Sequence, residues 1–547
     1  MSRKPKKTRK VNKFVIIGLA AALVASTLAV VYNPINPQQD EAKALFCGSG
    51  VANSNRYIQE FVIPTECSEP VGITVDSNGI VWFAESAKRK IGKFDPATGK
   101  FDEYALLDSK EQEKTTPVAS IWSMKFDDQG NLWFPDVLAN AIWKFDPSTA
   151  RFETYKILTT TDFGTSYPLN LDFDNSGKIW FSEIYGKNIG VLDPNKVQHN
   201  TSNGISEISA RTDLETIGPL AFDNDGNIWF TALTYPAVGR LMKFEPEKKV
   251  FTTFNMPEGI FSPVGIAPDK DGNLWINDHG TSAFIKFNPD TNTTTTYVTS
   301  LPVRNTSIGG YEKCLTQPYG SSITCPGLPV SLPYWNTIDN QGRIWFNEHQ
   351  GNSIAVFDPA TETLVEYFIP TQNSRWAACE EYTEPCGIAN PLQFTLADDG
   401  KVWFTEWSEN KIGVLNPDLS LPISVQILSD RESLSGKDLS GISGPYRVSH
   451  GEPLTLNVWV TANEKLNDSV QMRISGTIVP AGRLFNMTAE FSEEELTFNE
   501  PSTKNVTLKL TPEDELAPGN YRITVSARYN EVTYSKIIEL TVVPTKI

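Results

Sequence analysis

Hydrophobic residues along most of this chain recur in short runs that alternate with polar residues and end at glycine turns. Seven of these runs contain a tryptophan, nearly always in the form Ile/Leu/Val-Trp-Phe: Trp82, Trp133, Trp180, Trp229, Trp275, Trp345 and Trp403. A glycine stands three residues before each tryptophan, and Asp, Asn or Glu followed by proline comes 13 residues after it in six copies. Period-two alternation predicts β-strands, and glycine supplies the positive φ that tight hairpins need.

Each copy of the repeat has room for four strands. Seven four-stranded repeats predict a seven-bladed β-propeller over residues 57–420, closed around a central channel. The segment Tyr57–Pro64 precedes the first copy and resembles the fourth strand of the others, so we expect it to complete the last blade. Such a closure would remove two exposed sheet edges.

The pattern changes after Pro417. Strict alternation now recurs in at least five segments, which predicts an immunoglobulin-like β-sandwich over residues 421–547, with a leading linker. The segment Ala517–Ala527 resembles the last hairpin of such domains. Because Ser429–Gly444 is rich in Ser, Gly and Asp, we expect the sandwich to fold independently of the propeller. All of the fold is therefore expected to be β apart from the N-terminus.

The N-terminus predicts a membrane anchor. Residues 1–13 carry seven basic residues, and Phe14–Tyr32 are 19 residues without a charge, enough to cross a bilayer as a helix. The basic flank predicts that residues 1–13 are a cytoplasmic tail and that the chain after the apolar segment is extracytoplasmic. We expect residues 33–56 to be a linker. A signal peptide cleaved near Ala42-Lys43-Ala44 is the alternative, although that site lies far past the apolar run.

Composition narrows the class of protein. The net charge of −17 disfavours binding to nucleic acid, and 40% hydrophobic residues exclude a disordered chain. The six cysteines fall into three local couples, predicted to be disulfides in an oxidising compartment: Cys47 with Cys67, Cys314 with Cys325, and Cys379 with Cys386. Glycosylation sequons are also present, at Asn200, Asn292, Asn305, Asn467, Asn486 and Asn505.

Carboxylates form the first candidate site. The residue three after the repeat tryptophan is acidic in six blades: Glu85, Asp136, Glu183, Asp278, Glu348 and Glu406. A ring of carboxylates could hold Mg²⁺ or Ca²⁺, with Asp278, Glu348 and Glu406 as the candidate ligands. The alternative is that each carboxylate caps backbone N–H groups of its own or a neighbouring blade.

Histidines and aromatic residues form the second candidate site. His279 and His349 occupy the same offset in adjacent blades, directly after a ring acid, and are candidate catalytic groups. Neighbouring residues on a strand point to opposite faces, so histidine and acid need not converge. Tyr334, Trp335 and Trp407 are candidates for a ligand-stacking wall, with packing between blades as the alternative.

The repeat resembles the virginiamycin B lyase (streptogramin lyase) family of seven-bladed propellers. The resemblance rests on PVGITVDSNGIVWFAESAKRKIG in the first blade and GKVWFTEWSENKIG in the last. It implies the fold and a Mg²⁺-dependent ring opening of cyclic depsipeptides by histidines in a Pro-His-Gly/Ala-Ile motif. The equivalent positions, 11 before each tryptophan, hold no histidine: they are Val71, Trp122, Leu169, Gly218, Val264, Tyr334 and Leu392. The matching lyase chemistry, which needs a general base, is therefore not expected.

Together these features predict a membrane-anchored surface module whose partner is a small molecule, a glycan or a surface protein. The rival hypothesis is a divalent-metal lyase or lactone hydrolase, resembling streptogramin lyase or gluconolactonase, that uses the acidic rim and His279 or His349. A purely structural envelope component is the third possibility and would show no pocket.

Overall fold

The computed structural model describes residues 47–106, 120–162, 164–234, 238–257, 259–260, 262–300, 330–373, 387–429, 445–476 and 486–544. Within them the chain forms β-strands and one short 3-10 helix, η1 (Ser86–Lys88). The prediction of an all-β fold is confirmed. None of the helical structure in these ranges is long and apolar enough to cross a bilayer, and the predicted anchor Phe14–Tyr32 lies outside them.

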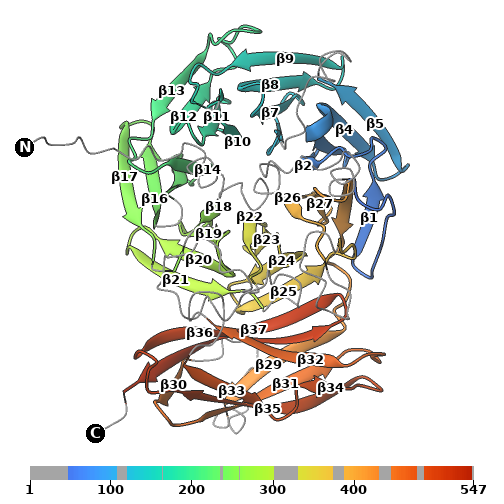
Figure 1. The fold of residues 1–547 in the computed structure, drawn as a ribbon, viewed down its shortest axis with the longest axis vertical. Coiled ribbons are helices and arrows are strands. Elements are labelled where there is room, and N and C mark those ends of the chain that lie inside the picture. Colours follow the sequence, from blue (N-terminus) through green and yellow to red (C-terminus); the bar gives the residue numbers. More distant parts are fainter. Residues whose placement is uncertain are drawn as a thin grey trace, which may run out of the picture.

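Seven four-stranded antiparallel units, here called blades one to seven, follow one another round a ring (Figure 1). Blades one to three are β2 (Pro70–Val75), β3 (Val81–Glu85), β4 (Lys90–Asp95), β5 (Lys100–Ala105); β6 (Lys125–Phe126), β7 (Leu132–Asp136), β8 (Ala141–Asp146), β9 (Arg151–Lys156); and β10 (Pro168–Phe173), β11 (Ile179–Glu183), β12 (Asn188–Leu192), β13 (Ile205–Ser209). Blades four to six are β14 (Thr216–Phe222), β15 (Ile228–Thr234), β16 (Val238–Glu245), β17 (Val250–Asn255); β18 (Pro263–Pro268), β19 (Leu274–Asp278), β20 (Ala283–Asn288), β21 (Thr293–Val298); and β22 (Pro333–Ile338), β23 (Ile344–Glu348), β24 (Ser353–Asp358), β25 (Thr363–Phe368). Blade seven is β26 (Pro391–Leu396), β27 (Val402–Glu406), β28 (Lys411–Leu415) and β1 (Ile58–Val62).

The first strand of the chain completes the last blade. β1 pairs antiparallel with β28, from Ile58 opposite Leu415 to Val62 opposite Lys411. This pairing confirms the prediction that the segment before the first repeat supplies the missing fourth strand. The disulfide between Cys47 and Cys67 spans β1 and is one of the three predicted couples; the other four cysteines lie outside the described residues.

An aspartate six residues before the repeat tryptophan explains the hairpin of each of the first six blades. In blade one, Asp76 accepts hydrogen bonds from the Trp82 indole at 3.0 Å and from the backbone N–H of Ile80 at 3.1 Å. One carboxylate thus fixes both the turn and the tryptophan. The same bond from the indole nitrogen recurs at Asp127, Asp174, Asp223, Asp269 and Asp339.

The third strand of several blades has glycine after isoleucine, because the phenylalanine of the second strand lies against that glycine. A Cβ added at Gly92 would stand 2.2 Å from the Phe83 ring, and the distance is also 2.2 Å between Gly413 and Phe404. Only glycine leaves room for the ring at these positions, so the motif is a packing requirement.

The C-terminal residues form two sheets that share one hydrophobic core. One sheet contains β29 (Ile423–Ser429), β31 (Leu454–Ala462), β35 (Ser502–Pro512) and β33 (Met487–Phe491). The other contains β37 (Val532–Val543), β36 (Gly519–Tyr529), β32 (Val470–Gly476), β34 (Glu495–Leu496) and, beside β37, β30 (Tyr446–Ser449). Since β29 belongs to the first sheet, this unit begins before the Ser- and Gly-rich stretch.

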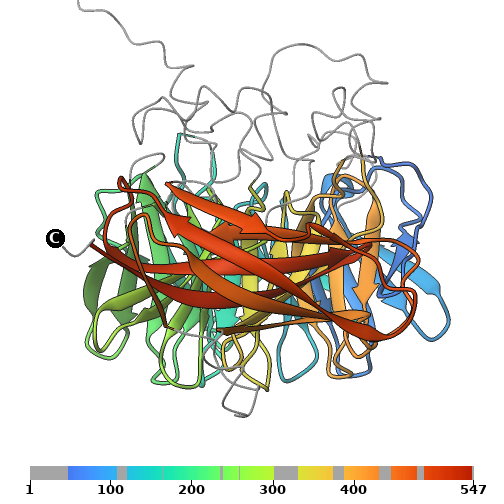
Figure 2. The same ribbon diagram turned by 90° about the horizontal axis from the view of Figure 1, so that it is seen from below.

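The C-terminal unit is fused to the ring through a shared sheet. β37 pairs antiparallel with β25, the outer strand of blade six, from Thr363 opposite Lys536 to Tyr367 opposite Val532. Val532 packs into the core between blades six and seven. Thr524 donates a hydrogen bond to the Val298 carbonyl of blade five at 2.9 Å. In Figures 1 and 2 the unit lies against the rim beside β25, at the level of the ring. The blade-six sheet therefore continues into the C-terminal unit, and independent folding of that unit stays a prediction.

Candidate functional site

The start of each first strand turns two consecutive residues toward the axis of the ring. In six blades this strand carries a β-bulge, as between Pro70 and Ile73, where two residues oppose one on the neighbouring strand. The first of the two is the position where the lyase family resemblance implies histidine. Here those positions meet as a hydrophobic cluster, which we call the axial plug, containing Val71, Trp122, Leu169, Val264, Tyr334 and Leu392.

The position four after the repeat tryptophan completes the axial plug. Its members there are Val137, Ile184, Leu233 and Trp407, all buried. Tyr334 packs edge-on against Trp122 with ring centroids 6.4 Å apart. Of the residues expected to form a stacking wall, Tyr334 and Trp407 are therefore in the plug, and Trp335 is partly buried beside it.

His279 and His349 occupy this same position in blades five and six, and the structure brings them together. Nε2 of His279 lies 3.1 Å from Nδ1 of His349, and Nε2 of His349 lies 2.9 Å from Oδ1 of Asn390. The Tyr334 ring lies 4.6 Å from that of His279. Burial lowers the pKa of His349 to about 4, and burial and the neighbouring His349 hold the pKa of His279 well below its usual value. Both imidazoles are therefore neutral at physiological pH.

Two of the ring acids, Asp136 and Asp278, are held by contacts within or between blades. Asp136 forms a buried bidentate pair with Arg89 of the preceding blade, one bond being 2.8 Å. Asp278 accepts hydrogen bonds from the Ser262 N–H at 2.5 Å and from the Thr281 hydroxyl at 2.8 Å. The bond from the Ser262 N–H is of the backbone-capping kind, whereas the pair with Arg89 joins two blades through side chains.

Burial disfavours the ionised form of the glutamates in the ring. Burial, with a contribution from Glu103, raises the pKa of Glu85 to about 8. Burial likewise raises the pKa of Glu183 and of Glu348 to about 7 and that of Glu406 well above its usual value. Among the residues that the structure describes, no three His, Cys, Asp or Glu side chains are grouped to hold a metal ion. Asp278, Glu348 and Glu406 are not brought together in such a group, and their role as Mg²⁺ or Ca²⁺ ligands stays a prediction.

Below the plug the axis opens into a cavity of about 730 Å³, which we call the lower cavity. All seven blades line it. Its upper residues directly follow plug residues in the sequence and are Ser123, Asn170, Trp335 and Gln393. The repeat predicted a central channel but not which residues line it, since the bulge that separates this cavity from the plug leaves no motif.

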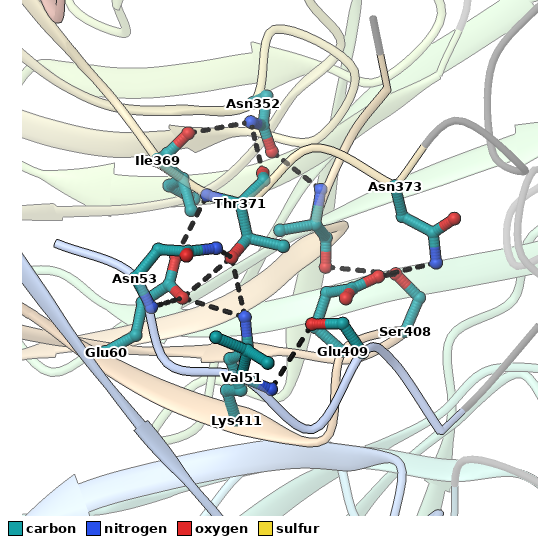
Figure 3. A network of polar contacts seen from close by, with 12 residues as sticks. Val51, Asn53, Glu60, Asn352, Ile369, Thr371, Asn373, Ser408, Glu409 and Lys411 are labelled. Atoms are coloured by element: carbon teal, nitrogen blue, oxygen red, sulfur yellow. Dashed lines mark hydrogen bonds and ion pairs between the residues drawn. The ribbon is translucent and has the colours of Figure 1, made fainter. Parts of the chain in front are cut away.

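A buried polar network joins the N-terminal strand to blades six and seven (Figure 3). Lys411 donates hydrogen bonds to Glu60 at 2.8 Å and to Thr371 at 2.6 Å, and the side chains of Lys411 and Glu60 are both 0% exposed. Glu60 also accepts a bond from the Asn53 N–H at 2.9 Å. This network holds the closure of the ring.

Sequence reasoning missed a second set of residues that join blades, seven positions after the repeat tryptophan. Asn410 adopts φ 56°, donates to the carbonyls of Ile63 and Thr65, and accepts bonds from Ser68 of blade one at 2.6 and 2.7 Å. Asn140 and Asn352 make equivalent bonds in blades two and six. The signal was available, because Asn tolerates positive φ better than most residues.

A known protein family matches the N-terminal part of the described chain. Residues 50–187 match the virginiamycin B lyase family, which confirms over that range the resemblance inferred from the repeat. No curated protein matches the chain.

Among solved structures, a streptogramin B lyase is 23% identical and covers 66% of this chain and 97% of its own, with a TM-score of 0.49. Virginiamycin B lyase from Staphylococcus aureus is 20% identical, covering 66% and 98%, with a TM-score of 0.49. The extracellular domain of a proposed hybrid two component system from B. thetaiotaomicron is 18% identical, covering 90% of this chain and 60% of its own, with a TM-score of 0.44.

Proposed function

We propose that this protein is a membrane-anchored, extracytoplasmic binding module, made of a seven-bladed β-propeller and an immunoglobulin-like C-terminal domain. The observation that carries the proposal is the axial plug. It places Tyr334 and Leu392 at the positions of the last two blades where the family resemblance implies histidine, so those two positions supply no base. A propeller that keeps its fold and lacks this chemistry is suited to binding a small molecule, a glycan or a surface protein.

A lyase would need a base that can reach the α-proton of its substrate. The experiment therefore incubates the full chain with a cyclic depsipeptide lactone, with and without Mg²⁺, and follows ring opening by mass spectrometry. We expect no opening under conditions in which a virginiamycin B lyase completes the reaction. Mg²⁺-dependent opening by this chain would overturn the proposal.

A lactone hydrolase or lyase that uses His279 and His349 is the second candidate. The contact between the two imidazoles and the Asn390 amide favours it, because a chain of imidazoles can pass a proton. If this candidate is correct, His349→Ala abolishes lactone opening by the chain while the melting temperature changes little. If the imidazoles only pack, His349→Ala lowers the melting temperature and no lactone is opened by either protein.

The extracytoplasmic location has its own support. The five sequons within the described residues, Asn200, Asn292, Asn467, Asn486 and Asn505, all have exposed side chains. Alkaline carbonate should leave the full chain in the membrane pellet, and external protease should digest all but the N-terminal segment. Release of the chain by carbonate would contradict an uncleaved anchor.

A further inference from the structure

The outermost strand of each blade has one edge that its own blade leaves unpaired. Such an edge exposes backbone N–H and C=O groups that pair easily with another strand, so proteins cover these edges or place charges on them. Within the described residues, this chain protects six of its seven outer strands in one of these ways. The exception is β17, the outer strand of blade four, which lies on the rim of the ring (Figure 1).

Four outer strands are covered by other segments of the chain. β37 pairs with β25 of blade six. The backbone of Asn200 and Thr201 bonds to β9 of blade two at 2.7 and 2.9 Å, and the backbone of Asn53 bonds to β1 of blade seven at 3.2 Å. β21 of blade five lies against the C-terminal unit, where the Arg522 guanidinium is 4.9 Å from the centre of the Tyr297 ring.

Two further outer strands carry charge. β5 of blade one contains Lys100, Asp102 and Glu103. β13 of blade three contains Glu207, whose carboxylate accepts a hydrogen bond from the Leu158 N–H at 2.9 Å. A charge on an edge strand disfavours pairing with a further strand, because the charge would lose water on pairing.

β17 (Val250–Asn255) has neither kind of protection. Its sequence, Val-Phe-Thr-Thr-Phe-Asn, contains no charge, and β16 is its only strand partner in the part of the chain that the structure describes. Thr252 and Thr253 are exposed, and Val250 is 46% exposed. An uncharged edge that the described chain leaves open is available to a strand of another molecule.

The sequence of β17 complements itself across a two-fold axis. Two copies of one strand pair antiparallel about an axis through a single residue position, because facing side chains must lie on the same side of the sheet. With the axis at Thr252, Val250 of each copy faces Phe254 of the other, and the two Thr252 side chains face each other. Aromatic–β-branched pairs and Thr–Thr pairs of this kind stabilise antiparallel sheets.

The nearest charges do not oppose this pairing. In the same register Lys249 faces the Asn255 amide of the second copy, and the two Lys249 residues lie six positions apart along the paired strands. At about 3.4 Å per residue their separation is about 20 Å, more than twice the Debye length of ~8 Å. A second copy of this chain therefore fits the edge in both side-chain pairing and charge.

We infer that β17 is a self-association surface, at which two copies of this chain join their fourth blades into one continuous antiparallel sheet. The chain already extends a blade in this way, since β37 pairs with blade six by the same main-chain bonds. One pair of short strands is a small interface, so the dimer should form reversibly and depend on concentration. The surface lies on the outer rim and not at the axial plug, so the inference goes beyond the proposed binding function.

The first test is sedimentation equilibrium of the full chain in detergent, at about 1–100 μM. We expect a monomer–dimer equilibrium. Thr252→Lys places two like charges directly opposite each other, so it should weaken the dimer about tenfold or more without changing the melting temperature. Ser206→Lys is the matched control, because Ser206 is exposed on β13, another outer strand, and its substitution should leave the dimerisation constant within about twofold.

Cysteine substitution tests the register. Thr252→Cys brings two cysteines opposite each other with Cα atoms about 4.5–5.5 Å apart, which is within the range of a disulfide. Thr253→Cys is exposed as well, but its two copies are diagonal neighbours about 7–8 Å apart, which is too far. Mild oxidation should therefore give a disulfide-linked dimer for Thr252→Cys and little for Thr253→Cys on a non-reducing gel.

Three results would overturn the inference. A wild-type chain that stays monomeric up to about 100 μM would show that β17 does not pair with itself. A dimer that Thr252→Lys leaves unchanged would place the interface elsewhere on the chain. Equal cross-linking of the two cysteine variants would exclude antiparallel pairing about Thr252.

Discussion

Replacing Lys411 with methionine tests whether the buried network in Figure 3 holds the ring closed. The substitution removes both Lys411 bonds and leaves the fully buried Glu60 without its counter-charge. Removing one partner of a buried ion pair costs about 3–5 kcal/mol. Glu60 keeps its bonds from Asn53 and Thr371, so the lower end, about 3 kcal/mol, is expected.

The assay is native-state hydrogen exchange read by mass spectrometry on a peptide that covers β1. This readout is suited to a chain of two coupled units, for which a single unfolding free energy is poorly defined. Lys411→Met should lower the opening free energy of β1 and leave that of β11 unchanged. Lys401→Met is the matched control, because its pair with Asp399 is exposed and should contribute less than about 1 kcal/mol.

The double variant Lys411→Met/Glu60→Gln tests whether the loss of stability comes from the uncompensated charge of Glu60. Because it removes both charges, it should recover part of the loss, so the two substitutions are non-additive. A cost below about 0.5 kcal/mol for Lys411→Met, or strict additivity in the double variant, would refute the reasoning that an uncompensated charge drives the effect.

Three further predictions follow from the packing. Stability should fall as the pH rises from 5 to 9: burial raises the pKa of Glu85 to about 8 and of Glu183 to about 7, so stabilisation by the protonated carboxyls is complete below pH 4.5 and lost through pH 7–8. Glu85→Gln should flatten the dependence of the melting temperature on pH between about 5 and 8, and an unchanged slope would argue that Glu85 is ionised. Gly92→Ala should destabilise by about 1–3 kcal/mol in thermal unfolding through contact with Phe83, whereas Gly519→Ala, with nothing closer than 3.9 Å, should be nearly neutral. A chain ending at Pro422 should self-associate in light scattering because β25 becomes an open edge, and a monodisperse ring would show that the edge is harmless.

The repeat made most of the fold predictable. The spacing of tryptophan and glycine and the strand before the first repeat predict the blades directly. Each of these features corresponds to a fixed contact within one blade, such as that of Gly92 with Phe83. The opposite orientation of Asp278 and His279 also followed from strand alternation. The pairing of β25 with β37 did not, because main-chain bonds between two edges need no particular side chain.

The site was less predictable for a related reason. Whether His279 meets His349 or a carboxylate depends on how the ends of β19 and β23 approach each other across two blades, and no sequence motif encodes that approach. The lower cavity is likewise made by residues from seven separate blades. The positions that line it can be recognised in the sequence only once the repeats are aligned.

The pairing of β1 with blade seven sets the order in which this protein can mature. Glu60 and Lys411 are 351 residues apart, so at roughly 5–20 residues per second the ribosome needs about 18–70 s to deliver the partner strand. Throughout synthesis β1 is a strand without a sheet, and the six intervening blades can assemble only into an open arc. Cys47 and Cys67 are close in sequence and need no other blade to find each other. Early oxidation of this couple would therefore keep the waiting strand folded back on blade one until the arc can close.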